Sequence, residues 1–348
     1  MSQPPRLGAN ALLGISFVAM AVLSLEIVSM RLWAVESYSS FGHMVLSVAM
    51  LGFGVSGTLL AVAGGRLRAH TALLLDTSSL LFPLCVSLSV VLARQVPFHP
   101  QDLMKDGAQV AYVGLLYLIQ FLPFFTGSFF IGLLLLSAGE RVGRLYGADL
   151  IGSGLGGLLS LAAFYALPPR WLPEYVVVLG FAGHLAWRGG SLLRAPRWTA
   201  AAVASVLAAA TLLALSGELR VSEDKYVPYR LSTAPITGAE IVAERHGPLG
   251  FLQILESSSE LCAWGLSTAT PPEAVVPRSA RVCVDGHAGA CVARPMEAGD
   301  AAFMDWTLSS LAWRLVPGGR VLMVGLNGGL GVREALRYGA RNVVVAER

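Results

Sequence analysis

The sequence predicts a polytopic helical membrane domain of about seven spans, then a β-rich segment, then the opening unit of an α/β domain. The 348 residues have a mean hydropathy of +0.63 and are only 14% charged, whereas about a quarter of residues are charged in soluble domains. Residues 1–217 are apolar with isolated charges, and 218–348 resemble a soluble domain in composition. Residues 321–348 follow the order strand, glycine turn, helix, strand, acidic residue.

Seven apolar segments approach or exceed the length of about 20 residues that a spanning helix needs. They lie at 11–33, 43–64, 73–93, 111–137, 147–167, 173–187 and 198–216. The sixth is short, so the number of spans depends on it.

Positive charges in the loops indicate an orientation. The amino-terminal side carries Arg6, Arg66, Arg68, Arg141, Arg144, Arg188, Arg194 and Arg197; the other side carries Arg31, Arg94, Lys105 and Arg170. The excess places the amino terminus in the cytoplasm. Seven spans would then place the soluble part outside, which is awkward for a domain built for a cytosolic cofactor. One span fewer would reverse this, so the side stays open.

Charged residues inside the spans are candidates for function, because charge at membrane depth is costly. Glu26 and Arg31 lie five residues apart in the first span, about 140° around a helix, so a direct pair is not assured. Structural pairing of Glu26 and a ligand path are both open. Asp76 and Asp149 lie near span ends, where we expect water to reach them.

Small residues in two spans favour close helix packing. In the fifth span the pairs are Gly152 with Gly156 and Ser153 with Gly157; the second span contains Gly52, Gly54 and Gly57. A substrate site is the weaker interpretation of these residues. The same glycine-rich spans are the candidate surface for homo-oligomer formation.

The soluble part is predicted to contain a linker over 218–239 and short strands at 240–245, 251–256, 280–285 and 290–294. Gly247–Gly250 and Asp285–Gly286 are turn signals between them. Residues 301–315 are expected to form one amphipathic helix, with Phe303, Leu308, Leu311, Ala312 and Leu315 on its apolar face.

Cysteines and net charge exclude two classes of site. No CxxC pair is present, which argues against zinc, and a net charge of +3 without a basic run argues against nucleic acid. Cys283 and Cys291 flank the 285–289 turn, so a disulfide between them and two unpaired core thiols are both open.

The last segment indicates a site for a nucleoside-containing ligand. Strand 321–325 is apolar throughout, as expected of a strand buried in a parallel sheet. A glycine turn over 325–331 leads into helix 332–338, and strand 342–346 ends beside Glu347. Glycines allow close backbone approach, and an acid at this spacing accepts hydrogen bonds from ribose hydroxyls. The candidate cofactor-binding residues are Gly325, Asn327, Gly328, Gly329 and Glu347.

Several stretches resemble the spermidine synthase (polyamine aminopropyltransferase) superfamily, in particular its membrane-fused bacterial branch. In the membrane part they are 26–31 and 145–156; in the soluble part they are 247–250, 264–267, 284–286, 302–308 and 321–347. The resemblance implies an S-adenosylmethionine-type, Rossmann-like domain beginning at 320–348, after a synthase-like segment at 240–319. It also implies a multi-pass protein of the bacterial inner membrane.

The chain departs from the family pattern at several positions. Gly328 stands where the family turn has an aspartate, which removes an amine contact. Asp305 replaces a glutamate and Phe303 a tyrosine. Asp305 is a tentative amine-side carboxylate, against the alternative of a solvent-facing acid. The family's catalytic aspartate would lie beyond the second strand, so no catalytic residue is assigned and a carboxyl-terminally truncated product is expected.

The function implied by the resemblance is aminopropyl transfer from decarboxylated S-adenosylmethionine to a small-molecule amine, without a metal. Two alternatives remain open. One is a transporter-like or ligand-sensing membrane protein with a non-catalytic domain. The other is a methyltransferase that uses intact S-adenosylmethionine.

Overall fold

The computed structural model describes residues 8–189, 196–215, 225, 240–256, 265–274, 276, 279–293 and 299–347. The chain divides into two compact units, Met1–Asp224 and Lys225–Arg348, each with its own hydrophobic core. The division falls inside the predicted linker 218–239, of which only Lys225 is described.

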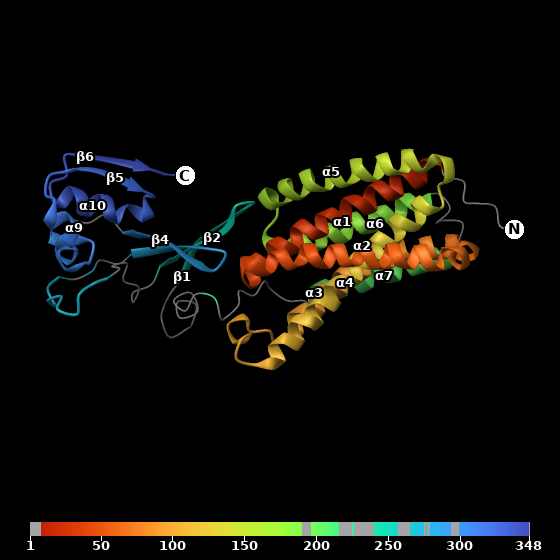
Figure 1. Cartoon of the computed structure of the whole chain (residues 1–348), viewed down its shortest axis with the longest axis horizontal. Helices are drawn as coiled ribbons and strands as arrows, with labels where there is room; N and C mark the ends of the chain where they lie inside the picture. Colours follow the sequence, from red (N-terminus) through yellow and green to blue (C-terminus); the bar gives the residue numbers. More distant parts are fainter. Residues whose placement is uncertain are drawn as a thin grey trace. The chain divides into compact units, whose positions relative to one another are not determined.

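Seven α-helices lie between residues 8 and 215 of the described chain (Figure 1). Six are long and apolar enough to cross a membrane, which identifies a multi-pass membrane protein. The remaining helix, α6, has 17 residues and is the predicted sixth span. The bounds are α1 Ala9–Glu36, α2 Ser39–Leu67, α3 Thr71–Gln95, α4 Gly107–Leu136, α5 Val142–Ala166, α6 Leu172–Arg188 and α7 Pro196–Leu215.

Helix α1 lies at the centre of this bundle and packs against α2, α4, α5 and α6. Its side chains are buried around much of its circumference, including Ile15, Val18 and Ala21, each 0% exposed. A helix that is apolar on all sides is suited to such a position. The other helices leave one face to the surroundings, with large apolar side chains such as Val62 and Leu158 exposed.

Glycines allow α5 to approach α1 closely, as the small-residue spacing predicts. A Cβ built on Gly152 would lie 2.2 Å from the Ser16 carbonyl oxygen, and one on Gly156 would lie 2.5 Å from that of Met20. In α2, Gly52 packs against Phe124 of α4 in the same way. The same role predicted for Gly54 and Gly57 is wrong for the described chain, in which no other helix lies within 4 Å of a Cβ built at either position.

Helix α6 runs the length of α1 in the opposite direction. At one end Gly14 of α1 meets Trp187, and further along Val18 meets Gly183. At the other end Pro173 lines the same cavity as Glu36. The short sixth span is therefore a full member of the bundle.

Helix α7 reverses direction once more. Trp198, near its start, stacks under the Arg188 guanidinium at 5.3 Å, and Leu213, near its end, lines a groove with Trp171. Consequently the start of α1 and the end of α7 lie at opposite ends of the bundle.

The second unit begins with a four-stranded antiparallel sheet in the order β1-β2-β3-β4. The strands are β1 Glu240–Gly247, β2 Gly250–Glu256, β3 Ser279–Val284 and β4 His287–Ala293, which overlap the four predicted ranges. Asp285 and Gly286, between β3 and β4, both have positive φ, 52° and 73°. This geometry is typical of tight hairpin turns with Asp-Gly.

The two cysteines of this hairpin do not bond to each other. Cys283 is opposite Ala288, and Cys291 is opposite Arg281. Cys283 is buried and outside any disulfide, whereas Cys291 is disulfide-bonded. Neither interpretation from the sequence holds as stated.

The single amphipathic helix predicted over 301–315 is wrong. A 3-10 helix, Gly299–Trp306, is followed by a break and by α9, Ser310–Leu315. Thr307 pairs with Leu266 in a short antiparallel bridge, and Ser310 Oγ donates to the Thr307 carbonyl oxygen at 2.8 Å. Hydrogen bonds from a side chain to the nearby backbone compete with the backbone hydrogen bonds of a continuous helix. Phe303 is buried as predicted, but Leu308, Leu311 and Leu315 are exposed.

The chain then forms one β-α-β unit with parallel strands. The elements are β5 Arg320–Val324, a 3-10 turn Asn327–Gly329, α10 Leu330–Arg337 and β6 Asn342–Ala346. The sequence predicts that β5 is buried on both faces. This prediction is wrong for the described chain, in which Leu322 and Val324 are 69% and 87% exposed. Met323 points the other way and contacts Gly331 of α10, so α10 covers one face of the strand pair.

Candidate functional site

The glycine turn after β5 adopts a backbone that only glycine reaches easily. Gly325, Gly328 and Gly329 have φ of +85°, +77° and +85°, in the left-handed region that costs other residues about 1–2 kcal/mol. The turn reverses the chain within five residues, so α10 begins directly at the carboxyl end of β5. Ligands of open parallel sheets bind at this edge.

Glu347 lies beside this turn, at the end of β6. The Gly325 N–H donates to the carbonyl oxygen of Ala346 at 2.8 Å, which places Gly325 next to Glu347. The Leu326 N–H donates to Glu347 Oε2. The side chain is exposed, and this hydrogen bond holds it against the turn.

The turn is open at two of its glycines and closed at the third. No side chain or distant backbone atom of the described residues lies within 4 Å of a Cβ built on Gly325 or Gly329. At Gly328 a Cβ would lie 1.7 Å from the Cys291 carbonyl oxygen of β4. Gly328 therefore packs against the antiparallel sheet, and any side chain at this position would displace β4. Asn327 lies in the same 3-10 turn.

Asp305 lies at the other end of α10 from the glycine turn. Its carboxylate accepts hydrogen bonds from Arg337 Nη2 at 2.6 Å, Arg337 Nε at 3.2 Å and Tyr338 Oη at 2.6 Å. The Arg337 hydrogen bond, together with that of Tyr338, holds the pKa of Asp305 below its usual value. Seven residues of helix, about 10 Å, separate Arg337 from the start of α10. Asp305 is thus an anchor for α10 and is not brought to the turn.

Sequence reasoning missed Glu334, a buried carboxylate on α10 that is 3% exposed. It accepts hydrogen bonds from Thr307 and Ser309, each at 2.8 Å, and from Trp313 Nε1 at 3.3 Å. These donors come from the segment where the predicted helix breaks. The hydroxyl residues Thr307, Ser309 and Ser310 were the signal in the sequence that this segment can donate hydrogen bonds to a buried acceptor.

In the membrane unit, Glu26 is half-buried on α1 and forms no hydrogen bond or ion pair with Arg31 or with the rest of the described chain. Structural pairing, one of the two interpretations, is therefore not found there.

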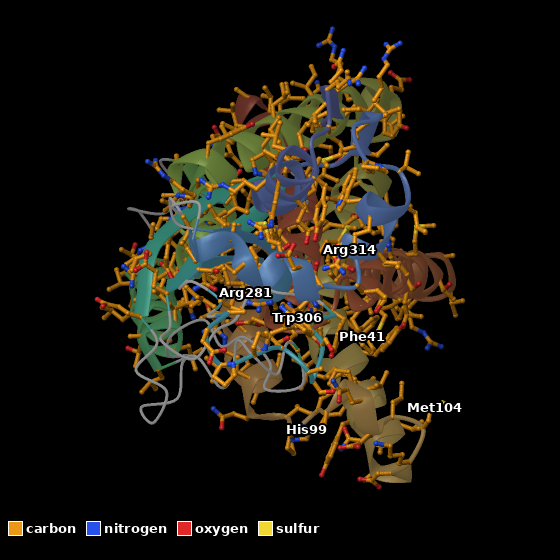
Figure 2. The ribbon with its side chains drawn as sticks, turned by 90° about the vertical axis from the view of Figure 1, so that its left-hand side faces the viewer. Phe41, His99, Met104, Arg281, Trp306 and Arg314 are labelled. Carbon is orange, nitrogen blue, oxygen red and sulfur yellow. The ribbon has the colours of Figure 1, made fainter. Side chains whose placement is uncertain are left out.

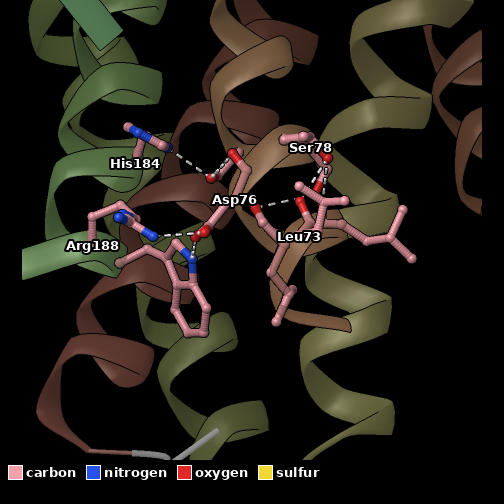
Figure 3. Close-up of polar contacts among 10 residues, drawn as sticks. Leu73, Asp76, Ser78, His184 and Arg188 are labelled. Atoms are coloured by element: carbon pink, nitrogen blue, oxygen red, sulfur yellow. Dashed lines mark hydrogen bonds and ion pairs between the residues drawn. The ribbon is translucent and has the colours of Figure 1, made fainter. Parts of the chain in front are cut away.

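We expected water to reach Asp76, but this residue is buried and only 8% exposed. Figure 3 shows its carboxylate between two side chains of α6. Trp187 Nε1 donates to Oδ1 at 2.8 Å, and Arg188 Nη1 donates to Oδ2 at 2.6 Å. One turn along α3, Ser79 bonds to His184 Nδ1 at 2.8 Å. The network joins α3 to α6. Asp149 is only half-buried.

No group of three or more His, Cys, Asp or Glu side chains that could hold a metal occurs within the described ranges. Comparisons of the chain with protein-family models, with curated proteins and with solved structures find no match.

Proposed function

We propose that the second unit binds an adenosyl ligand of the S-adenosylmethionine class at the glycine turn, in a membrane-anchored protein that transfers an aminopropyl group. The observation that carries this proposal is the position of Glu347 beside the open Gly325. The β-α-β unit would then be the first part of a Rossmann-like domain. The helices of the first unit would anchor the protein in the bacterial inner membrane.

The chemistry of the turn suits this ligand. Glu347 would accept hydrogen bonds from the two ribose hydroxyls, which are donors that a carboxylate binds strongly. The open positions at Gly325 and Gly329 would let the adenosyl group approach the backbone. The start of α10 adds the positive potential of a helix amino terminus.

In aminopropyl transfer, an amine nitrogen attacks the carbon next to the sulfonium of decarboxylated S-adenosylmethionine. A new C–N bond forms as the C–S bond breaks, and the sulfur leaves with the electron pair as a neutral thioether. The ammonium then loses a proton to a base. The residues at the turn would contribute by holding the adenosyl group so that the attack is in line.

A non-catalytic role in ligand sensing is favoured by one observation. Asp305, the tentative amine-side carboxylate, is bound by Arg337 and Tyr338 at the far end of α10. Binding without turnover is therefore the second candidate. Methyl transfer from intact S-adenosylmethionine would use the same turn and is distinguished only by its product.

The test is a titration of the purified full chain in nanodiscs with S-adenosylmethionine, its decarboxylated form and adenosine. Each should bind, and Glu347→Ala should weaken each at least about tenfold, because a hydrogen bond to a charged group contributes about 1.5–3 kcal/mol. Glu240→Ala, which removes an exposed carboxylate from β1, is the matched control.

2′-Deoxyadenosine separates ribose recognition from general damage to the turn. The wild-type chain should bind 2′-deoxyadenosine more weakly than adenosine. Glu347→Ala should bind the two ligands with equal affinity, as in a double-mutant cycle. Equal affinity of the wild type and Glu347→Ala for adenosine would exclude the site. If binding occurs, incubation with an amine and each co-substrate distinguishes aminopropyl transfer, methyl transfer and sensing by product mass.

A further inference from the structure

The membrane unit contains a cavity of about 550 Å³ between α1, α3 and α4. This volume is within the range of small-molecule sites, about 300–1,000 Å³. The cavity also touches Pro173 at the start of α6 and the segment that joins α3 to α4, where His99 lines it. Figure 2 labels His99 and Met104 on this segment.

The cavity is apolar at one end and charged at the other. Along α1 its wall runs from Leu25 to Glu36, which is about 16 Å at 1.5 Å per residue. The Leu25 end is also lined by Val28 and Val86, which are 1% and 0% exposed. The Glu36 end, where α1 terminates, contains Arg94 and the aromatic ring of Trp33.

Glu36 and Arg94 form an ion pair in this wall. Arg94 donates to Glu36 Oε1 from Nη2 at 2.8 Å and from Nε at 3.1 Å. The Arg94 side chain is 11% exposed, and the Glu36 side chain is 26% exposed. The pair joins the last turns of α1 and α3, so both charges face the same space.

The pair restricts which ligands can use the cavity. A ligand with one charge that engages one partner competes with the other partner for it and weakens their ion pair in a partly buried site, which is costly. A zwitterion engages both: its anionic group pairs with Arg94, and its ammonium pairs with Glu36. The ammonium also gains from the ring of Trp33 and from the carboxyl-terminal ends of α1 and α3.

We propose that this cavity binds a small zwitterion with an apolar body, the charged head at the Glu36–Arg94 pair and the body toward Leu25. This inference does not depend on the proposed function of the second unit. A hydrophobic amino acid and a single-chain zwitterionic lipid share this chemistry, and the experiment distinguishes them.

The experiment is a binding titration on the full chain in detergent, with matched probes. Phenylalanine is the zwitterion, phenylalaninamide has only the positive charge, and N-acetylphenylalanine has only the negative charge. We expect phenylalanine to bind at least about tenfold more tightly than either, a difference of about 1.4 kcal/mol. A short-chain lysophosphatidylethanolamine is the lipid probe; its binding in place of phenylalanine would assign the site to lipid.

Variants locate the binding. Glu36→Gln and Arg94→Gln should each abolish selectivity for the zwitterion. Ala93→Phe, which fills the cavity and retains both charged residues, should abolish binding even if the charge variants fail to fold. Lys105→Gln is the control, because it breaks an exposed ion pair with Asp102 on the same connecting segment. Failure of both zwitterionic probes to bind, equal affinity for a singly charged probe, or unchanged binding in Ala93→Phe would overturn the proposal.

Discussion

Arg188 of α6 donates a 2.6 Å hydrogen bond to Asp76 of α3, and both side chains are nearly buried, 12% and 11% exposed. The pair, with Trp187 on the other carboxylate oxygen, anchors the shortest helix of the bundle. It explains how a 17-residue helix holds its place across the bundle.

Removal of Asp76 should therefore destabilise the membrane unit. Asp76→Ala leaves the Arg188 charge buried without its partner, and we expect a loss on the order of 3 kcal/mol. Asp76→Asn retains an acceptor for Trp187 and should cost less. Denaturant unfolding in mixed micelles measures both, with the exposed pair variant Lys105→Gln as a control that should change stability by less than about 0.5 kcal/mol. Equal stability of all three variants would contradict this role.

The contact of α5 with α1 can be tested with two neighbouring glycines. Gly156→Ala places a methyl group 2.5 Å from the Met20 carbonyl oxygen, whereas no other helix of the described chain lies within 4 Å of a Cβ built on Gly154. We expect Gly156→Ala to cost about 1–3 kcal/mol through overpacking and Gly154→Ala to be close to neutral. The same unfolding assay distinguishes them, and similar effects at the two positions would argue against the close approach.

The glycine turn offers a similar comparison. Gly325→Ala should cost only the left-handed backbone penalty, about 1–2 kcal/mol, since space around it is open. Gly328→Ala adds a clash with the Cys291 carbonyl oxygen and should be clearly more destabilising. Hydrogen exchange of the β4 amides in the full chain measures this, because displacement of β4 should raise exchange only in Gly328→Ala.

Acid should weaken the contact between Asp305 and α10. The pKa of Asp305 is lowered in the folded chain, with Arg337 as the main cause, so its contribution is present above the usual pKa of 3.8. It is lost as pH falls through the lower folded value. Asp305→Asn should lower stability at pH 7 by about 1 kcal/mol or less, because the pair is partly exposed.

The difference between wild type and Asp305→Asn should shrink as pH falls below about 4, the unfolded pKa of an aspartate. Unfolding of the second unit, followed by hydrogen exchange at α10 over this pH range, tests the sign. A difference that grows in acid would show that Asp305 is not stabilised in its charged form.

The start of α1 and the end of α7 lie at opposite ends of the bundle, so we expect them on opposite sides of the bilayer if all seven helices cross it. Topology reporters fused before α1 and after Leu215 should therefore report opposite compartments. The positive-inside rule applied to the loop arginines predicts a cytoplasmic amino terminus, and with seven crossings the fusion after Leu215 should then report the outside. This experiment also decides which pool of adenosyl ligand would reach the site proposed at Glu347. Reporters on the same side would mean that one helix does not cross.

The sequence by itself determined the features that depend on neighbouring residues. All seven helices of the described membrane unit lie where the apolar segments predict them, because burial in lipid acts on each segment separately. The strands of the hairpins and of the β-α-β unit were predictable from local alternation and turn residues, as were the glycine turns.

The tertiary structure alone decided what each charged or small side chain meets. Asp76 is buried because α6 brings Trp187 and Arg188 to it, and Gly328 is closed because β4 packs on it. The helix expected over 301–315 breaks where distant residues take its hydrogen bonds. Gly265 and Ser267 bond the backbone of Leu308 and Trp306, and Glu334 accepts from the Thr307 hydroxyl. Such contacts join residues that no periodic pattern relates, since local spacing carries no record of which segments meet.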